Sequence, residues 1–273
     1  MARVRLGGMK LATWNVNSIR TRVDRVTAFL ERSGVDVLAM QETKCRDEQF
    51  PRAPFEALGY EVAHHGHNQW NGVAIASRVG LDDVAAGFEG MPTWGDAAEA
   101  RALGATVGRD VVDGGVRVWS LYVPNGREVS NPHYEYKLAW LAALRETAGG
   151  WVRAEPEARI ALVGDWNIAP EDQDVWSMEF FAGATHVSPP ERAAFAAFAE
   201  DGFTEVTRRF VPQQFTYWDY QQLRFPRNEG MRIDFVQASP ALARAVTGAA
   251  IERNERKGKG PSDHVPVIVE IAE

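Results

Sequence analysis

The segment RIALVGDWNIAP, residues 159–170, is the stretch of this sequence that says most about the fold. After Arg159 it is an almost uninterrupted apolar run, which is typical of a strand buried on both faces. The run ends in Asp165, Trp166 and Asn167, so polar groups follow the buried strand directly. The segment therefore predicts a core strand that brings a carboxylate and an amide to one edge of a sheet.

Similar segments recur along the whole chain. Helical spacing of apolar residues predicts a helix over 21–33 that stops at Gly34, and Asn131-Pro132 is typical of the start of a second helix over 131–153. Many strands follow one another without an intervening helix, which predicts an α/β fold of two mostly antiparallel sheets packed face to face, with helices outside. The further strands are predicted at MKLATWN (9–15), VDVLAMQE (35–42), YEVAHH (60–65), GVAIAS (72–77), RALGATV (101–107), VRVWSLYV (116–123), MRIDFVQAS (231–239) and VPVIVEIA (265–272).

The composition is that of an ordinary globular protein, with 273 residues of which 45% are hydrophobic and 25% charged. No apolar run approaches the roughly 20 residues of a membrane span, and the opening MARVRLGGMK lacks the apolar core of a signal peptide. The single cysteine, Cys45, agrees with a reducing compartment. We expect a cytoplasmic protein without membrane contact, in which residues 1–8 are an N-terminal extension and residues 9–273 form one domain.

Charge is distributed unevenly along the chain. The net charge of −7 argues against binding to nucleic acid by net charge alone. Residues 205–264 nevertheless carry ten basic and seven acidic residues, whereas residues 82–113 carry seven acidic and two basic residues. Two interpretations stay open: these are two solvated surfaces, or the basic region binds a polyanion.

Polar side chains stand at the ends of most of the predicted strands. Any one of them alone is explained by the ordinary use of Asn and Asp in turns, and the segment GPSDHVPVIVE, residues 260–270, opens with common turn residues. Ordinary turn usage does not explain so many polar side chains at the ends of successive strands. Because a sheet brings its strand ends to a common rim, we expect these side chains to converge on one cleft. The groups are Asn15, Asn17, Gln41, Glu42, Tyr122, Asn125, Asp165, Asn167, Asp234, Asp263 and His264.

The chemistry of these groups suits the hydrolysis of a phosphoester. Oxygen ligands from Glu42, Asn17 and Asp263, with no cysteine cluster, favour a hard cation such as Mg²⁺. An imidazole held by a carboxylate would carry positive charge towards a phosphate, and a further carboxylate would orient or deprotonate a water. Amide and phenol groups would donate hydrogen bonds to phosphate oxygens as charge develops on them.

Seven segments resemble the exonuclease III family of Mg²⁺-dependent abasic-site endonucleases and 3′-exonucleases, within the larger superfamily of endonucleases, exonucleases and phosphatases. They occur in the order of that family and span nearly the whole chain. The resemblance implies a four-layer α/β sandwich, which agrees with the two sheets predicted above. The segments are TWNVNSIR (13–20), LAMQETK (38–44), YVPNGRE (122–128), GDWNIAP (164–170), TYWDY (216–220), GMRIDF (230–235) and SDHVP (262–266).

The resemblance also implies roles for the residues of the rim. Glu42 matches the main metal carboxylate, with Asn17 and Asp263 close to the metal, which is Mg²⁺ with Mn²⁺ as a substitute. Asp165 matches the residue that activates the water or protonates the leaving group, and both roles stay open. The remaining matches are the phosphate-orienting groups Asn15, Asn167 and Tyr122 and the hydrogen-bonded pair of His264 and Asp234.

The substrate implied by the resemblance is duplex DNA, and we expect the protein to act as a monomer. Members of the family cut 5′ to an abasic site and trim blocked 3′ ends, and a small apolar pocket selects the abasic sugar because it leaves the base stack at little cost. Tyr217, Trp218, Met231 and Ile233 match that pocket, and Arg127 matches a residue that enters the duplex. Some relatives carry a bulky aromatic residue in place of Met231, so the balance between abasic-site incision, exonuclease and 3′-phosphatase activity stays open.

Two other functions are compatible with part of this pattern. A phosphatase or phosphodiesterase of the same superfamily, acting on a small phosphoester such as an inositol phosphate or a lipid, would share the carboxylate, amide and imidazole groups. A catalytically silent DNA-binding relative would share the fold but would have lost some of these groups, and none is missing. The stretch from TYWDY to GMRIDF favours a DNA-repair nuclease over both alternatives.

Overall fold

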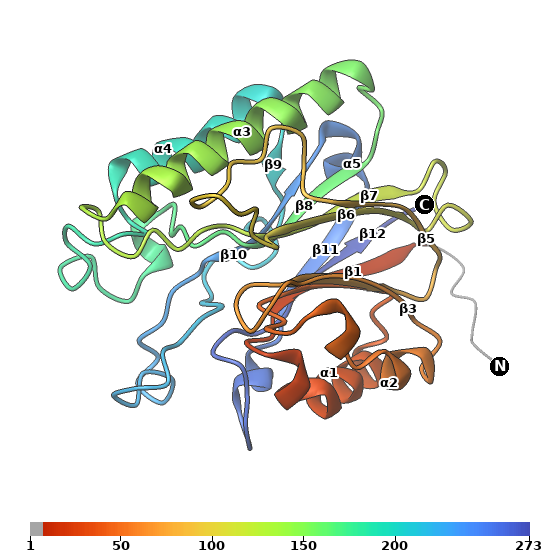
Figure 1. Ribbon diagram of the computed structural model, residues 1–273, viewed down its shortest axis with the longest axis horizontal. Helices are drawn as coiled ribbons and strands as arrows, with labels where there is room; N and C mark the ends of the chain where they lie inside the picture. The colour runs from red at the N-terminus through yellow and green to blue at the C-terminus, as the bar shows by residue number, and fades with distance from the viewer. Residues whose placement is uncertain (1–7) are drawn as a thin grey trace.

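The computed structural model describes residues 8–273 and contains two six-stranded sheets (Figure 1). The first sheet has the spatial order β11 (Val246–Ile251), β12 (Val267–Ile271), β1 (Met9–Asn15), β2 (Val37–Gln41), β4 (Val73–Ser77) and β3 (Glu61–His65). The second has the order β5 (Leu81–Ala86), β6 (Ala102–Val107), β7 (Val116–Tyr122), β8 (Ile160–Asp165), β10 (Asp234–Ala238) and β9 (Thr204–Glu205).

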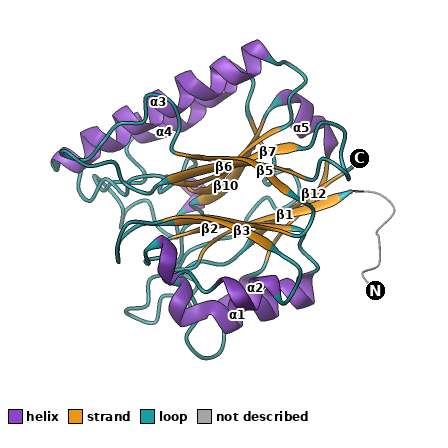
Figure 2. Ribbon diagram, turned by 45° about the vertical axis from the view of Figure 1, so that its right-hand side comes forward, coloured by secondary structure: helices purple, strands orange, loops and turns teal. Residues whose placement is uncertain are grey.

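The helices cover the outer faces of the two sheets, as Figure 2 shows. Helices α1 (Ile19–Ser33) and α2 (Arg52–Glu56) lie against the first sheet, and α3 (Pro132–Ala154) and α4 (Pro189–Ala196) lie against the second. Helix α5 (Pro240–Ala245) packs at the ends of β8 and β10. Short 3₁₀ turns complete the set: η1 (Asp47–Gln49), η2 (Asp172–Asp174), η3 (Ala197–Asp201) and η4 (Arg253–Arg256).

The predicted four-layer α/β sandwich with mostly antiparallel sheets is confirmed. The pairs β1/β2 and β7/β8 are parallel, and the other strand pairs of the described residues are antiparallel. Residues 1–7 of the predicted N-terminal extension lie outside the described residues. Within residues 8–273, no helix combines the length and the apolar character needed to cross a membrane.

Aliphatic side chains fill the space between the sheets. Val37 and Ile75 of the first sheet pack with Val118, Val163 and Val236 of the second, and all five are buried. Burying one such side chain contributes roughly 1.5–3 kcal/mol to the stability of the fold. This apolar layer is therefore the main source of the free energy that holds the two sheets together. Aromatic side chains instead dominate the layers beneath the helices, with Trp140 of α3 over the second sheet and Trp14 and Phe29 between the first sheet and α1.

The register of the strands brings the polar strand ends together. Asn15 pairs with Gln41 across the parallel pair β1/β2, and Tyr122 pairs with Asp165 across the parallel pair β7/β8. Strand β10 runs in the opposite direction, so its first residue, Asp234, pairs with the last residue of β8, Asp165. The strand predicted over 231–239 begins only at Asp234 in the structure. Asp234 is therefore the first residue of the strand and lies at the rim.

Candidate active site

His264 and Asp234 form a buried pair at the rim. The Nδ1 atom of His264 lies 2.8 Å from Oδ2 of Asp234, and the two residues are 4% and 1% exposed. Burial alone would lower the pKa of His264, but the Asp234 and Asp165 carboxylates outweigh it and raise that pKa to about 10. The structure thus favours a positively charged imidazole whose Nε2 faces away from Asp234.

Asp165 lies on the other side of this imidazole. Its Oδ2 atom is 3.7 Å from Nε2 of His264 and accepts a hydrogen bond of 3.0 Å from Nδ2 of Asn15, while Oδ1 accepts one of 2.9 Å from the backbone N–H of Asn167. Burial raises the pKa of Asp165 to about 7, with the Asp234 and Glu42 carboxylates adding to the rise and His264 opposing it. A carboxyl group with a pKa near neutrality is suited to exchanging a proton with a bound reactant.

Glu42, Asn17 and Asp263 provide oxygen atoms at the opening of the rim. Lys44 occupies the space between two of them: its Nζ lies 2.8 Å from Oε2 of Glu42 and also donates to Oδ1 of Asn17. The Nδ2 atom of Asn17 donates a hydrogen bond of 3.0 Å to Oδ1 of Asp263. Burial alone would raise the pKa of Glu42, but Lys44 and the Tyr122 hydroxyl stabilise the ionised carboxylate and lower it. These oxygens already hold a cationic group, so the donor set fits a hard cation.

A second group of possible ligands consists of Asp165, Asp234 and His264, whose ligand atoms lie within 4.8 Å of one another. All three side chains are buried, and Oδ2 of Asp234 is already bonded to the imidazole. Mg²⁺ usually keeps several waters in its coordination shell, which a buried carboxylate–imidazole cluster does not allow easily. The more open set around Glu42 fits such an ion better.

Tyr122 connects this open set to the second sheet. Its hydroxyl donates to Oε1 of Glu42, and burial together with the Glu42 charge raises its pKa well above the usual value, so the hydroxyl remains a donor. The guanidinium of Arg101 lies 4.9 Å from the Tyr122 ring centroid. The hydroxyl hydrogen is directed at Glu42 in this structure, and the phosphate-orienting role expected for Tyr122 stays a prediction.

Asn167 is held by the turns that surround it. Its Nδ2 donates to Val123 O at 3.0 Å, and its Oδ1 accepts from Nδ2 of Asn125 at 3.1 Å. Its backbone carbonyl accepts from Nζ of Lys137 at 2.6 Å and also contacts Nδ1 of His186. Each amide of Asn15 and Asn167 carries a second N–H, which none of these hydrogen bonds uses.

Sequence reasoning missed a buried ion pair beneath this turn. Lys137 of α3 pairs with Glu191 of α4, and both side chains are 0% exposed. Glu191 also accepts hydrogen bonds from Oγ1 of Thr185 at 2.7 Å and from the backbone N–H of His186 at 3.0 Å. One signal existed: Lys137 occupies an apolar face of the predicted helix, in line with Tyr134 and Leu141.

A pocket of about 190 Å³, mainly apolar but with three charged residues in its lining, borders the rim on the side of β10; we call it the apolar pocket. Two of the residues predicted to contact the lesion, Tyr217 and Met231, line it, together with Trp176, Phe181 and His186. The ring of Tyr217 lies 4.9 Å from that of His264, which places the pocket next to the reactive groups. His186 had no sequence signal beyond its residue type.

The predicted placement of Trp218 and Ile233 in this pocket is corrected by the structure. Trp218 is 0% exposed and packs with Ile251, Val265 and Val267, so its indole belongs to the core. Ile233 is 2% exposed and packs behind the pocket wall. Consecutive residues of an extended segment point to opposite faces, so Tyr217 and Trp218 cannot both face the pocket.

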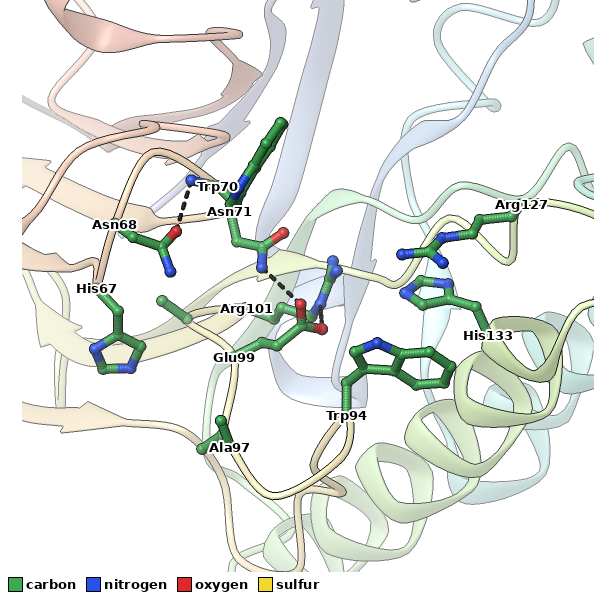
Figure 3. A pocket seen from close by; sticks show the side chains of 12 residues that line it. His67, Asn68, Trp70, Asn71, Trp94, Ala97, Glu99, Arg101, Arg127 and His133 are labelled. Atoms are coloured by element: carbon green, nitrogen blue, oxygen red, sulfur yellow. Dashed lines mark hydrogen bonds and ion pairs between the residues drawn. The ribbon is translucent and has the colours of Figure 1, made fainter.

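Arg127 lies apart from the apolar pocket. Its backbone N–H donates to Oδ1 of Asn125 at 3.0 Å, while its exposed guanidinium lies 5.7 Å from the centroid of the Trp94 indole (Figure 3). The structure thus places Arg127 beside the Tyr122 side of the rim.

Taken together, the sandwich and the carboxylate, imidazole and amide groups at one rim define a site for phosphoester chemistry, and the comparison with known families agrees. The chain belongs to the Endonuclease/Exonuclease/phosphatase family, whose model matches residues 12–264. It is 29% identical to exodeoxyribonuclease III of Haemophilus influenzae, with 96% of this chain and 99% of that protein aligned.

Two solved structures are similar over nearly the whole fold. The 3′ phosphatase NExo from Neisseria, bound to a product DNA hairpin, superposes with a TM-score of 0.89 at 35% identity, covering 96% of this chain and 99% of that chain. An AP endonuclease from Archaeoglobus fulgidus superposes with a TM-score of 0.87 at 33% identity, with the same coverage of 96% and 99%. The resemblance inferred from the seven sequence segments is thereby confirmed.

Proposed function

We propose that this chain is a metal-dependent DNA-repair nuclease that hydrolyses phosphodiester bonds, with residues 9–273 acting as one domain. The observation that carries the proposal is the meeting of Asp165, Asp234, His264 and Glu42, from both sheets, at one rim. The similarity to proteins named exodeoxyribonuclease III, 3′ phosphatase and AP endonuclease supports DNA as the substrate.

Asp165 is the group that transfers a proton in this proposal. It takes a proton from the attacking water or gives one to the leaving oxygen, and its raised pKa suits both roles. The charged imidazole of His264, held in one orientation by Asp234, stabilises the negative charge that develops on the phosphate. Asn15 and Asn167 donate their remaining N–H groups to phosphate oxygens.

The cation is Mg²⁺, with Mn²⁺ as a substitute, held by Glu42 together with Asn17 and Asp263. When bound, it neutralises phosphate charge and polarises the phosphoryl group. Lys44 would have to leave Glu42 and Asn17 for the cation to enter, since its ammonium contacts the same oxygen atoms. Tyr122 keeps the carboxylate of Glu42 in place by its hydrogen bond.

The substrates are duplex DNA with an abasic site and duplex DNA with a blocked or recessed 3′ end. The apolar pocket beside His264, lined by Tyr217 and Met231, supports this choice because it accepts a sugar residue without a base more easily than a whole nucleotide. The enzyme is expected to act as a monomer in the cytoplasm, and both of these statements remain predictions from the sequence.

Cleavage of labelled DNA tests this function. Three duplexes are compared, one with a stable abasic analogue, one with a recessed 3′ end and one with a 3′-phosphate, each in Mg²⁺ and in EDTA. The proposal expects Mg²⁺-dependent incision 5′ to the analogue or removal of the 3′ groups. Folded protein that leaves all three duplexes intact in Mg²⁺ but hydrolyses an inositol phosphate would contradict it, and inactivity on every ester would indicate a silent DNA-binding relative.

A further inference from the structure

Figure 3 shows a second cavity, of about 850 Å³. One of its lining residues, Arg101, lies against the ring of Tyr122 at the rim. We call this second cavity the Trp94 cavity; the lining residues used below are Trp70, Asn71, Trp94, Glu99, Arg101, Arg127 and His133. Its volume falls within the roughly 300–1,000 Å³ that is usual for small-ligand sites. None of these residues lines the apolar pocket of Tyr217 and Met231, so the two cavities are separate.

The wall of the Trp94 cavity is bonded to the rim at three places. The backbone carbonyl of Asn71 accepts from the backbone N–H of Lys44 at 2.9 Å. The guanidinium of Arg101 lies 4.9 Å from the ring centroid of Tyr122, and its Nη1 donates to the carbonyl oxygen of that residue at 3.3 Å. Arg127 follows the Asn125 turn that holds Asn167. These contacts place the wall of the Trp94 cavity next to the residues of the rim.

Flat π surfaces line the inside of the cavity. Trp94 is half-buried and is held edge-on against His133, with ring centroids 4.8 Å apart, while Arg127 lies over its indole. Burial lowers the pKa of His133 to about 4, so its ring is uncharged near neutral pH. Trp70, 65% exposed, stands at the edge of the opening. Indole rings and guanidinium planes are the surfaces on which proteins stack unpaired nucleobases.

The charges of the cavity also fit a nucleic acid strand. The carboxylate of Glu99 is neutralised inside the wall, because Nε of Arg101 lies 2.6 Å from it and Nδ2 of Asn71 donates to it at 2.9 Å. The guanidinium of Arg127 faces an aromatic ring and solvent, so its positive charge remains available to a phosphate.

We infer that the Trp94 cavity binds an unpaired nucleobase from a nucleotide adjacent to the phosphate that is cut. The base stacks on the Trp94 indole in place of the Arg127 guanidinium, and Asn71 contacts its edge. This inference rests on the proposed nuclease function and extends it: the enzyme takes DNA in which one nucleotide beside the scissile phosphate has lost its partner. The apolar pocket on the other side of the rim then holds the sugar that carries the lesion or the end.

Fluorescence titration tests this inference with full-length protein in EDTA, where DNA is bound without being cut. Duplexes carry 2-aminopurine as the single unpaired nucleotide, placed in turn on the 5′ side and the 3′ side of an abasic analogue and at a 3′ end. Stacking on Trp94 quenches the fluorescence in at least one position. Replacing that base by a second abasic analogue weakens binding about 5- to 150-fold, the range that corresponds to one base–aromatic stack.

Variants separate stacking from general damage to the loop. Trp94→Ala abolishes both the quenching and the dependence on the base, whereas Trp94→Phe restores most of each. Phe210→Ala is the matched control, because Arg209 lies 4.6 Å from the Phe210 ring centroid in the same kind of pair but outside the cavity lining. It leaves both readouts unchanged.

The possible results decide between the two claims. Equal binding of the duplexes with and without the base at every position overturns the inference, as does a Trp94→Ala variant that weakens both duplexes equally. If Mg²⁺ then still supports cleavage, the nuclease function stands without the cavity. Base-dependent binding without any cleavage in Mg²⁺ refutes the nuclease function instead.

Discussion

The buried pair of Lys137 and Glu191 offers a perturbation whose cost follows from the structure. Lys137→Met removes the cation but leaves the carboxylate of Glu191 at 0% exposure without its charged partner. Breaking a buried ion pair in this way costs about 3–5 kcal/mol, because one charge remains in the interior. For a chain of this size that corresponds to a fall in Tm on the order of 6–20 °C.

The same substitution acts on the rim. Nζ of Lys137 donates to the carbonyls of Asn167 at 2.6 Å and Asn125 at 3.2 Å, so both turns lose an anchor. We expect turnover to fall even at temperatures where the variant is fully folded. Urea unfolding and cleavage rates at 15 °C below the Tm of the variant measure the two effects separately.

Two controls complete this test. Arg153 lies on α3, the helix of Lys137, and its side chain is 65% exposed. Arg153→Met breaks its 3.2 Å contact with Asp201 of η3 and should cost less than about 1 kcal/mol. Replacing both buried partners, with Lys137→Met and Glu191→Leu together, removes the unpaired charge but leaves the donors of Thr185 and His186 without their acceptor. The double variant should therefore recover only part of the stability and none of the turnover, since the anchors of Asn125 and Asn167 remain absent. A Lys137→Met protein within 1 kcal/mol of the wild type would refute the reasoning.

Three further predictions concern single groups. Glu42→Ala raises the Mg²⁺ concentration needed for half-maximal cleavage, and an unchanged Mg²⁺ titration would remove Glu42 from the metal site. His264→Gln lowers turnover by roughly 10²- to 10⁴-fold while DNA affinity, measured in EDTA, changes little; an equal loss in both would point to a binding role. Burial lowers the pKa of His64 to about 4, below that of an unfolded histidine, so its contribution to stability is present above pH ~6.5 and is lost as the pH falls towards 4. Urea midpoints at pH 7 and pH 5 should therefore differ less in His64→Gln than in the wild type, and an identical difference would contradict the assignment.

Most residues of the rim could be predicted from the sequence, because they stand at the ends of strands. Asn15, Asp165 and His264 each follow or precede a buried apolar run, and a sheet necessarily collects such positions at one edge. The pairing of Asp234 with His264 joins residues 30 positions apart, and the geometry that brings them to 2.8 Å comes from β10 and the approach to β12. The contact between Asp234 and His264 depends on how the strands are arranged in the two sheets, so the local sequence pattern does not predict it.

Other elements left weaker signals or none. Strand β5 is almost wholly exposed at a sheet edge, so it lacks the apolar run that reveals a buried strand. Helix α4 does carry a sequence signal, because Ser188 and Glu191 have the spacing of a capping box at a helix start. The pair of Lys137 and Glu191 connects two helices 54 positions apart, and a pattern within one helix cannot name the partner in another.

The most direct test of the account is the single-turnover rate of Asp165→Asn. The central claim is that Asp165 transfers a proton at a rim that binds DNA. The variant keeps the shape of the side chain, and its single amide oxygen can accept one of the two hydrogen bonds, from Asn15 or from Asn167, that the two carboxylate oxygens accept in the wild type. With a duplex carrying the abasic analogue in saturating Mg²⁺, the account predicts a rate at least about 10²-fold below that of the wild type, with DNA affinity retained. Cleavage at the wild-type rate would contradict the claim.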